Sequence, residues 1–467
     1  MKNGIPALFQ KVWFWIVVFI ILVVMQQWPK ASGEDITHSR EFFEQHLRSD
    51  FLGSIATVFY GIIPDTAIAW YHLLLLLQVG LTGLGLYLIF KGESLVYSRA
   101  NKIGIILILY LGIIIGSAQT RDGALFSFSI FGIGLYLESN KTEDSKMRAS
   151  LSALAWFFMI VGFSFRPWLS VALPFIFVSI SKLRSSKHSL SKVSTIGIAA
   201  LLLVSPFVID QSAKKVWNLQ NGYPQQIVMI HDLAASYCWS VDIDTVKHAG
   251  EGLRALATNP KALQEICQFF KPNTWQAVAG LDPVALPTQG MQAPISLINI
   301  NDSTKYDSLQ TAWIHVIAND PFTYIQNHLS FGTQVLVSGE SRNIGAIRAV
   351  QALLNTSELG NLYNLLLSLF MSVYEVFISF HLLSPFILVM YLIVSFIRNR
   401  NSEQQLVAKI TVRYAILAFI SWFSLTTIAF ASDNGRYTYT PIYFVYLVIM
   451  LESIGKSRNS STDKKVT

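Results

Sequence analysis

The sequence predicts an all-α polytopic membrane protein with about ten transmembrane helices, for three reasons. Of the 467 residues, 52% are hydrophobic. Only 13% are charged, against roughly a quarter in ordinary soluble domains. Basic clusters also bracket apolar runs of about 15 to 24 residues, close to the length that crosses a bilayer. These values exclude a disordered chain and disfavour a soluble globular one. No basic run is interleaved with aromatic residues, so the net charge of +7 does not indicate nucleic-acid binding.

The apolar runs give the predicted order of spans. Ten can be distinguished, at about 12–28, 67–90, 103–119, 123–137, 150–165, 168–181, 194–209, 383–397, 410–431 and 437–451. With the N-terminus inside, the inner loops and ends carry 20 Lys and Arg residues and the short outer loops carry six. Both termini are therefore expected on the cytoplasmic side. A cleavable signal peptide ending near Ala31-Ser32-Gly33 is the alternative for the first run.

Three parts follow from this order. Residues 1–209 form an N-terminal membrane domain with seven spans and a first outer loop at 29–66. Residues 210–382 form a mainly helical extracytoplasmic segment, and 383–467 form a C-terminal membrane domain with three spans and a cytoplasmic tail. We expect the end of the outer segment, near Glu375, to be an amphipathic helix on the membrane surface, with a helical hairpin as the alternative.

Both cysteines, Cys238 and Cys267, fall in the outer segment. An extracytoplasmic location favours a disulfide between them, and two unpaired thiols are the alternative. No Cys/His cluster has the spacing of a metal site, so we predict no structural metal.

Charged residues interrupt the apolar runs at three very short outer turns: "QTRD" with Arg121 and Asp122, "FRPW" with Arg166, and "SDNGR" with Arg436. Two full crossings need about 40 residues, so these charges are expected at or below the level of the outer headgroups. They are either structural ion pairs or a site for an anionic lipid phosphate, which guanidinium groups bind in a bidentate manner.

The first outer loop adds carboxylates to the same face. "GEDITHSREFFEQHLRSDF" places Phe42, Phe43, Leu47 and Phe51 at helical spacing, which predicts an amphipathic helix along the bilayer surface. Asp35 is either the cap of this helix or a general base, and Asp50 lies at its far end. In the middle of the second span, His72 and Gln78 are interpreted as packing residues with satisfied hydrogen bonds.

Six motifs in order resemble bacterial GT-C type glycosyltransferases, the polyprenyl-phosphate-sugar dependent superfamily that includes protein mannosyltransferases and aminoarabinose transferases. They are the first outer loop with Asp35 and Asp50, "TRDGALFSF", "FRPW", "MIHDLAAS", "TAWIHVIANDPFTYIQNHLSF" and "NGRYTYTPIYFVYLV". The sequence departs from the family pattern where Phe51-Leu52-Gly53 follows Asp50, and again at Asn319-Asp320 and Asn327-His328-Leu329.

The resemblance implies a function at the outer face of a bacterial inner membrane: transfer of a sugar from a polyprenyl-phosphate donor to a glycan, lipid or protein acceptor. It implies an acid/base role for Asp35, with Asp50 as a second carboxylate. It also implies that substrate is bound by residues of the turns and outer segment: Arg121, Asp122, Arg166, Arg436, Tyr437, His231 and Asp232. For His231 and Asp232, a local helix cap or salt bridge is the alternative.

Neither a cofactor nor a substrate is fixed by the sequence. A divalent cation near Asp35 is left open, because a lone carboxylate is poor evidence for a metal. Two other functions compete with sugar transfer. One is a polymerase or ligase of O-antigen or capsule type, which takes a lipid-pyrophosphate donor. The other is a flippase or transporter for a lipid-linked solute, which would be expected to place its charges near the bilayer midplane.

Overall fold

The computed structural model describes most of the chain up to residue 338 and short stretches beyond it. The described residues are 11–25, 43–48, 54–62, 68–91, 99–117, 120–184, 192–221, 225–259, 261–272, 276–279, 294–298, 302–338, 365, 368–369, 372, 390, 413–421, 423–424, 443–445 and 447–448. Within them the structure is almost entirely helical, since the named strands are two of two residues each. The all-α prediction is therefore confirmed for this part of the chain.

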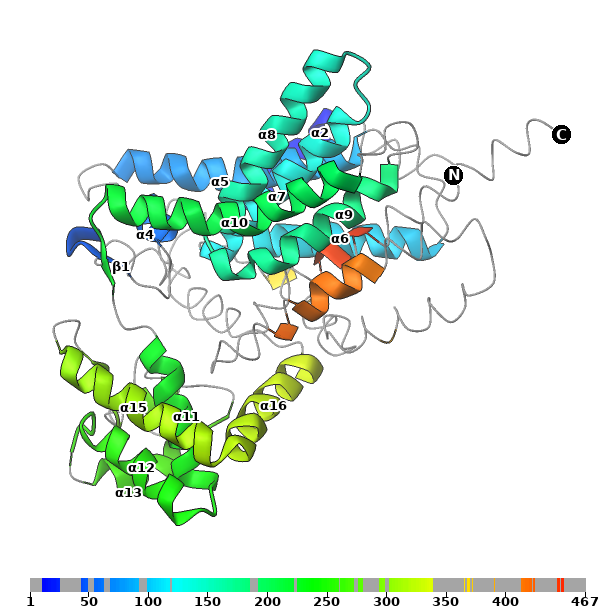
Figure 1. Cartoon of the computed structure of the whole chain (residues 1–467). Coiled ribbons are helices and arrows are strands. Elements are labelled where there is room, and N and C mark those ends of the chain that lie inside the picture. Colours follow the sequence, from blue (N-terminus) through cyan, green and yellow to red (C-terminus); the bar gives the residue numbers. More distant parts are fainter. Residues whose placement is uncertain are drawn as a thin grey trace.

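A bundle of helices forms the upper layer in Figure 1. Its elements coincide with the first seven predicted apolar runs, and the sixth run is divided into a 3-10 turn, η2, and a helix, α9. In chain order they are α2 (Val12–Met25), α5 (Ile68–Phe90), α6 (Arg99–Ser117), α7 (Arg121–Ser139), α8 (Ser145–Ser164), η2 (Pro167–Ala172), α9 (Leu173–Arg184) and α10 (Lys192–Val216). The boundary predicted at 209/210 falls inside α10, which continues to Val216.

Two of these helices are long and apolar enough to cross a membrane: α8, over Ser145–Ser164, and α10, over Val193–Val216. Only 28% and 17% of their apolar windows are buried inside the protein. The core helix of a soluble protein would be mostly buried, whereas here large apolar side chains such as Phe157 and Val204 face outward. This supports membrane association of the bundle, while the full set of ten spans remains a prediction.

Helix α7 is central and packs closely on α5 and α8 through glycines. A Cβ atom at Gly85 of α5 would lie 2.7 Å from the backbone nitrogen of Phe131. A Cβ at Gly132 would lie 2.7 Å from the carbonyl oxygen of Ala155 on α8. Small residues that let helix backbones approach are the usual packing device of helices in membranes.

A second group of helices lies below the bundle in Figure 1, and we call it the outer module. It consists of α11 (Gln225–Trp239), α12 (Ile243–Arg254), α13 (Ala262–Phe269), α14 (Gln276–Ala279), α15 (Ser303–Asn319) and α16 (Pro321–Ser338). The module has a core of its own around Ile230, Leu233, Ile266 and Leu309. A disulfide joins Cys238 to Cys267 with their Cα atoms 5.4 Å apart, as predicted. The mainly helical character predicted for this segment is also confirmed where it is described.

The first outer loop is joined to the start of the outer segment by a short parallel ladder. Strand β1 (Leu47–Arg48) pairs with β2 (Gln220–Asn221), and Gln220 N donates to His46 O over 2.8 Å. The amphipathic helix predicted across this loop is therefore wrong at Leu47 and Arg48, which are strand residues. Pairing with a distant segment overrides the local helical periodicity, which is a weak preference that tertiary contacts readily displace.

Beyond Ser338 the structure describes only short helical stretches, and those at 413–421, 423–424, 443–445 and 447–448 fall within the last two predicted spans. Tyr443 and Phe444 are buried against Phe126 of α7, with ring centroids 4.8 and 6.3 Å from that of Phe126. These two described residues thus pack onto the central helix of the bundle.

Candidate functional site

Arg166 and Asp122 form a buried ion pair at one end of the bundle. Arg166 Nη2 donates to Asp122 Oδ2 over 2.7 Å, and Arg166 Nε contacts Asp122 Oδ1. The Arg166 side chain is 0% exposed and that of Asp122 is 11% exposed. A hydrogen bond between two charged groups is shorter and stronger than one between neutral groups. Of the two interpretations left open by the sequence, an ion pair or a phosphate site, the geometry shows the ion pair for these two residues.

Local structure brings the pair together. Asp122 lies in the first turn of α7, where Thr120 caps the helix by accepting from Gly123 N over 3.2 Å. A carboxylate at this end is favoured by the helix dipole. Arg166 follows the C-terminus of α8, and Pro167 then starts η2. Each charged residue therefore sits at a helix end, where the chain turns back into the bundle.

Arg121 is buried beside the pair, with 1% of its surface exposed. The short helix α4 (Ser54–Gly61) lies against the same end of the bundle, because Tyr60 Oη donates to Thr120 O over 3.1 Å. The start of α4 is held by the buried Asp210 of α10, whose Oδ1 accepts from Ser54 N over 2.6 Å. Residues of the predicted first outer loop thus contribute directly to the surroundings of the arginines.

Aromatic side chains connect this end of the bundle to the outer module. The Trp168 ring stacks under the Arg166 guanidinium, with 5.5 Å between Cζ and the ring centroid, a cation–π contact. Phe331 of α16 is buried against Trp168 and Phe423. Helix α16 therefore packs, through Phe331, on the tryptophan that contacts Arg166.

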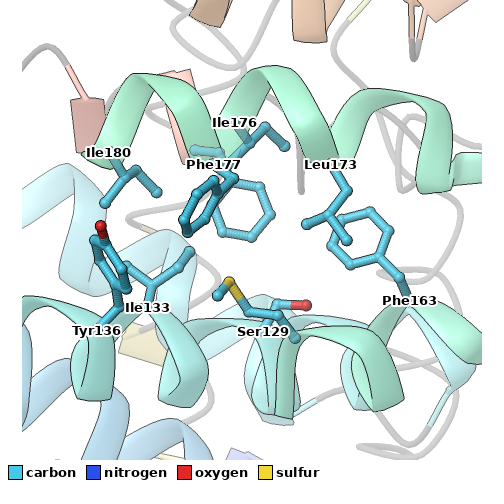
Figure 2. A pocket seen from close by; sticks show the side chains of 10 residues that line it. Ser129, Ile133, Tyr136, Phe163, Leu173, Ile176, Phe177 and Ile180 are labelled. Atoms are coloured by element: carbon cyan, nitrogen blue, oxygen red, sulfur yellow. The ribbon is translucent and has the colours of Figure 1, made fainter. Parts of the chain in front are cut away.

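A small apolar pocket lies deeper in the bundle, between α7, α8 and α9. Figure 2 shows Ile133, Phe163, Ile176 and Phe177 pointing into it, with Ser129 at its edge. Ser129 is eight residues along α7 from Arg121, roughly 12 Å at the rise of an α-helix. None of the residues that line the pocket is charged.

Polar groups farther along the bundle helices are hydrogen-bonded to neighbouring helices. Gln78 Nε2 donates to Gly116 O over 3.3 Å, and Thr82 Oγ1 donates to Ser127 Oγ over 2.8 Å. Gln78 is buried and donates to a neighbouring helix, which agrees with a packing role, while the side chain of His72 lies outside the described residues. The charges expected of a transporter are not found among these described groups.

The second set of predicted site residues, His231 and Asp232, lies inside the outer module. Asp232 Oδ2 accepts from Trp313 Nε1 over 2.9 Å, and Oδ1 accepts from Asn327 Nδ2 over 2.9 Å. His328 Nε2 lies 3.1 Å from the same Oδ1. The carboxylate is 1% exposed and links α11 to α15 and α16. Its observed contacts are those of a group that holds the module together, which matches the salt-bridge alternative.

His231 is also buried and neutral. Its Nε2 lies 3.0 Å from Lys271 O and its Nδ1 lies 3.2 Å from Asn327 Nδ2. Burial lowers the pKa of His231 to about 4, although Asp232 and the Lys271 carbonyl act to raise it. Burial, with a smaller effect of Asp232, raises the pKa of Tyr324 to about 12. His231 and Tyr324 are therefore neutral at pH 7.

The structure brings some predicted site residues together and separates others. Arg121, Asp122 and Arg166 are united at one end of the bundle, whereas His231 and Asp232 belong to a separate network in the outer module. Asp35, Asp50, Arg436 and Tyr437 lie outside the described residues, as does Glu375.

Sequence reasoning missed three kinds of group. Asp210 is a charged residue at the end of an apolar run, which could have marked it as buried. Trp313, Asn327 and His328 belong to the motif segment 311–331, but nothing in their spacing shows that they converge on Asp232. A cluster of His248, His315 and Asp244 was missed because it joins two helices.

The charged end of the bundle offers guanidinium groups, a carboxylate that orients one of them, and an aromatic wall from Trp168. Such a set suits recognition of an oxyanion such as phosphate. In the comparisons with known proteins, no protein-family model, no curated protein and no solved structure matches the chain.

Proposed function

We propose that the chain is an integral-membrane glycosyltransferase that moves a sugar from a polyprenyl-phosphate donor to a glycan, lipid or protein acceptor on the extracytoplasmic face. The observation that supports it best is the convergence of Arg121, Asp122 and Arg166, which come from two separate turns, at one buried end of an apolar bundle. In the proposed topology of ten spans, with both termini cytoplasmic, this is the outer end.

The donor phosphate is assigned to the arginine end of the bundle. Asp122 fixes the orientation of Arg166, and Arg121 and Arg436 approach the phosphate oxygens. During transfer the acceptor oxygen bonds to the anomeric carbon, and the bond from that carbon to the phosphate oxygen breaks. The polyprenyl phosphate leaves with the bonding electrons, so its negative charge grows during the step. Guanidinium groups already in place stabilise that charge without reorganising.

The acceptor proton is assigned to a carboxylate of the first outer loop. Asp35 takes the proton as the acceptor hydroxyl attacks, which is general-base catalysis. The described part of the structure supports proximity of this loop to the site, since β1 and α4 join it to β2, α7 and α10. Asp50 and Tyr437 complete the proposed surroundings. A divalent cation beside Asp35 is not required by this scheme.

The outer module is proposed to cover the site. Its network around Asp232 gives it a fixed shape, and the contact of Phe331 with Trp168 joins it to the arginine end. On this view His231 and Asp232 act through the shape of the module.

The test is transfer of radiolabelled sugar from a panel of polyprenyl-phosphate sugars, in membranes containing wild-type protein or variants. Asp35→Asn should abolish transfer and leave binding of polyprenyl phosphate largely intact, while Arg121→Gln should weaken both. Exposed residues of the outer module provide matched controls, Asp307→Asn for the carboxylate and Arg254→Gln for the arginine.

Three outcomes would contradict parts of the proposal. Full transfer by a well-expressed Asp35→Asn variant would remove the general-base assignment. Transfer only from lipid-pyrophosphate donors would indicate a polymerase or ligase. Binding of polyprenyl phosphate without transfer from any donor, together with movement of the lipid across vesicles, would indicate a flippase.

A further inference from the structure

Two histidines and two carboxylates meet on the surface of the outer module, where α12 and α15 pack together. His248 Nε2 lies 3.6 Å from Asp244 Oδ1, and its Nδ1 lies 3.4 Å from Glu251 Oε2. The ring of His315, from α15, stacks on that of His248 with 3.8 Å between the centroids. One ligand atom from each of Asp244, His248 and His315 lies within 4.8 Å of the other two.

Helix geometry explains the convergence. Asp244 and His248 are four residues apart on α12, and Glu251 is three residues further, so all three project from one face. His315 supplies the second imidazole from the neighbouring helix. The cluster is open to solvent, since 31% of the His248 side chain and 61% of the Asp244 side chain are exposed.

The donor set fits a metal ion better than it fits an isolated ion pair. Imidazole nitrogen and carboxylate oxygen are the ligands of zinc sites that keep one position open for water. A tetrahedral Zn²⁺ with bonds of about 2.0 to 2.1 Å holds its ligand atoms roughly 3.4 Å apart. The His248–Asp244 separation is already close to this value, and exposed side chains can make the remaining adjustment by small rotations.

The surrounding groups also suit a metal-bound imidazole. When Nε2 of His248 binds the ion, Nδ1 carries the proton and faces Glu251, which is the carboxylate–histidine–metal arrangement common in such sites. The amide nitrogen of Asn319 lies 2.9 Å from Nδ1 and 3.2 Å from Nε2 of His315. Turning that amide would present its oxygen to the protonated Nδ1, which leaves Nε2 for the metal.

We propose that Asp244, His248 and His315 bind one late first-row divalent cation, with Zn²⁺ as the ion expected, and that Glu251 supports the site from behind His248. The ion would join α12 to α15 on the solvent side of the module. Trp313, two residues before His315, anchors α15 to Asp232 on the inner side. The site is distinct from the arginine end of the bundle and does not depend on the glycosyltransferase proposal.

The experiment uses the full-length protein in detergent, purified with a tag that contains no histidine and stripped of metal with a chelator. Zn²⁺ binding is measured by calorimetry, and metal content after dialysis by atomic absorption. We expect one Zn²⁺ per chain. His248→Gln or His315→Gln should abolish binding, and Glu251→Gln should weaken it by about 10- to 100-fold.

Asp307→Asn, an exposed carboxylate on α15, is the matched control and should bind like wild type. The thermal midpoint in chelator should be the same for all variants, which shows that they are folded, and added Zn²⁺ should raise it only where the site is intact. Zn²⁺ binding unchanged by either histidine substitution would overturn the proposal. Absence of stoichiometric Zn²⁺ uptake by the wild-type protein would also overturn it.

Discussion

Removing the charge of Asp122 tests whether the buried ion pair holds the end of the bundle together. In Asp122→Asn the Arg166 guanidinium, which is 0% exposed, loses its charged partner. Breaking a buried pair in this way typically costs about 3–5 kcal/mol, because an uncompensated charge stays in a poorly polar environment. The contact of Arg166 with Trp168 remains and offsets only part of this, since a cation–π contact contributes about 0.5–2 kcal/mol.

The assay is the free energy of unfolding in mixed micelles, compared between wild-type protein and four variants: Asp122→Asn, Arg166→Gln, the two combined, and Glu138→Gln. Glu138→Gln is the control on the same helix, because Glu138 contacts Lys91 and Lys141 at 3.2 and 3.4 Å with all three side chains more than a quarter exposed. Exposed pairs contribute about 0–1 kcal/mol, so this variant should lose little. The double variant Asp122→Asn/Arg166→Gln should lose less than the sum of the single variants, because no unpaired charge remains. Additive effects, or an Asp122→Asn loss no larger than that of Glu138→Gln, would refute the reasoning.

Three further predictions concern packing, pH and the disulfide. Gly85→Ala should destabilise the bundle by about 1–3 kcal/mol in the same unfolding assay, because the new methyl group meets the α7 backbone. Gly80→Ala on the same helix should be neutral or stabilising, because no atom lies within 4 Å of the position its methyl group would take. The pKa of His231 is about 4 in the folded protein, below its ordinary value of 6.5. The unfolded chain therefore takes up the proton first, and the free energy of unfolding should fall by up to about 3 kcal/mol as the pH drops from 6.5 to 4. Thermal midpoints measured across this range should fall with pH in the wild type, and this dependence should be absent in His231→Gln. Cys238→Ser should lower the free energy of unfolding by about 3–4 kcal/mol, the value expected for a disulfide that closes a loop of 29 residues. Reduction should change the gel mobility of the wild-type protein and leave that of the variant unchanged.

Helix positions in the bundle could be predicted from the sequence because they depend on local properties. A run of apolar residues long enough to span a bilayer can be recognised from one short stretch of sequence. Helix α5, for example, begins and ends within a residue or so of the predicted run. Helix ends were predicted less well where polar residues continue the helix. The predicted seventh span stops at 209, but Asp210 to Lys215 are compatible with helix, and α10 runs on to Val216.

Interactions between distant residues could not be predicted in the same way. The short turns indicated that Arg121, Asp122 and Arg166 are buried, but the partner of Arg166 lies 44 residues away and is chosen by helix packing. The pairing of Leu47 with Gln220 replaced a helix that the local pattern favoured. In the cluster of α12 and α15, the spacing of Asp244 and His248 is visible in the sequence, whereas the arrival of His315 depends on the fold of the module.

The two-residue ladder between β1 and β2 has a consequence for membrane topology. Hydrogen-bonded residues must lie on the same side of a bilayer, so Leu47 and Gln220 share one compartment. The chain between them can therefore cross the membrane only an even number of times. The bundle helices in that interval are α5, α6, α7, α8, α9 with its preceding turn η2, and α10, which makes six passages if each crosses. The pairing of these two strands thus requires an even number of membrane crossings between them, whatever hydropathy and charge suggest. If one helix in this interval did not cross, a second change in the crossings would be needed to keep the number even.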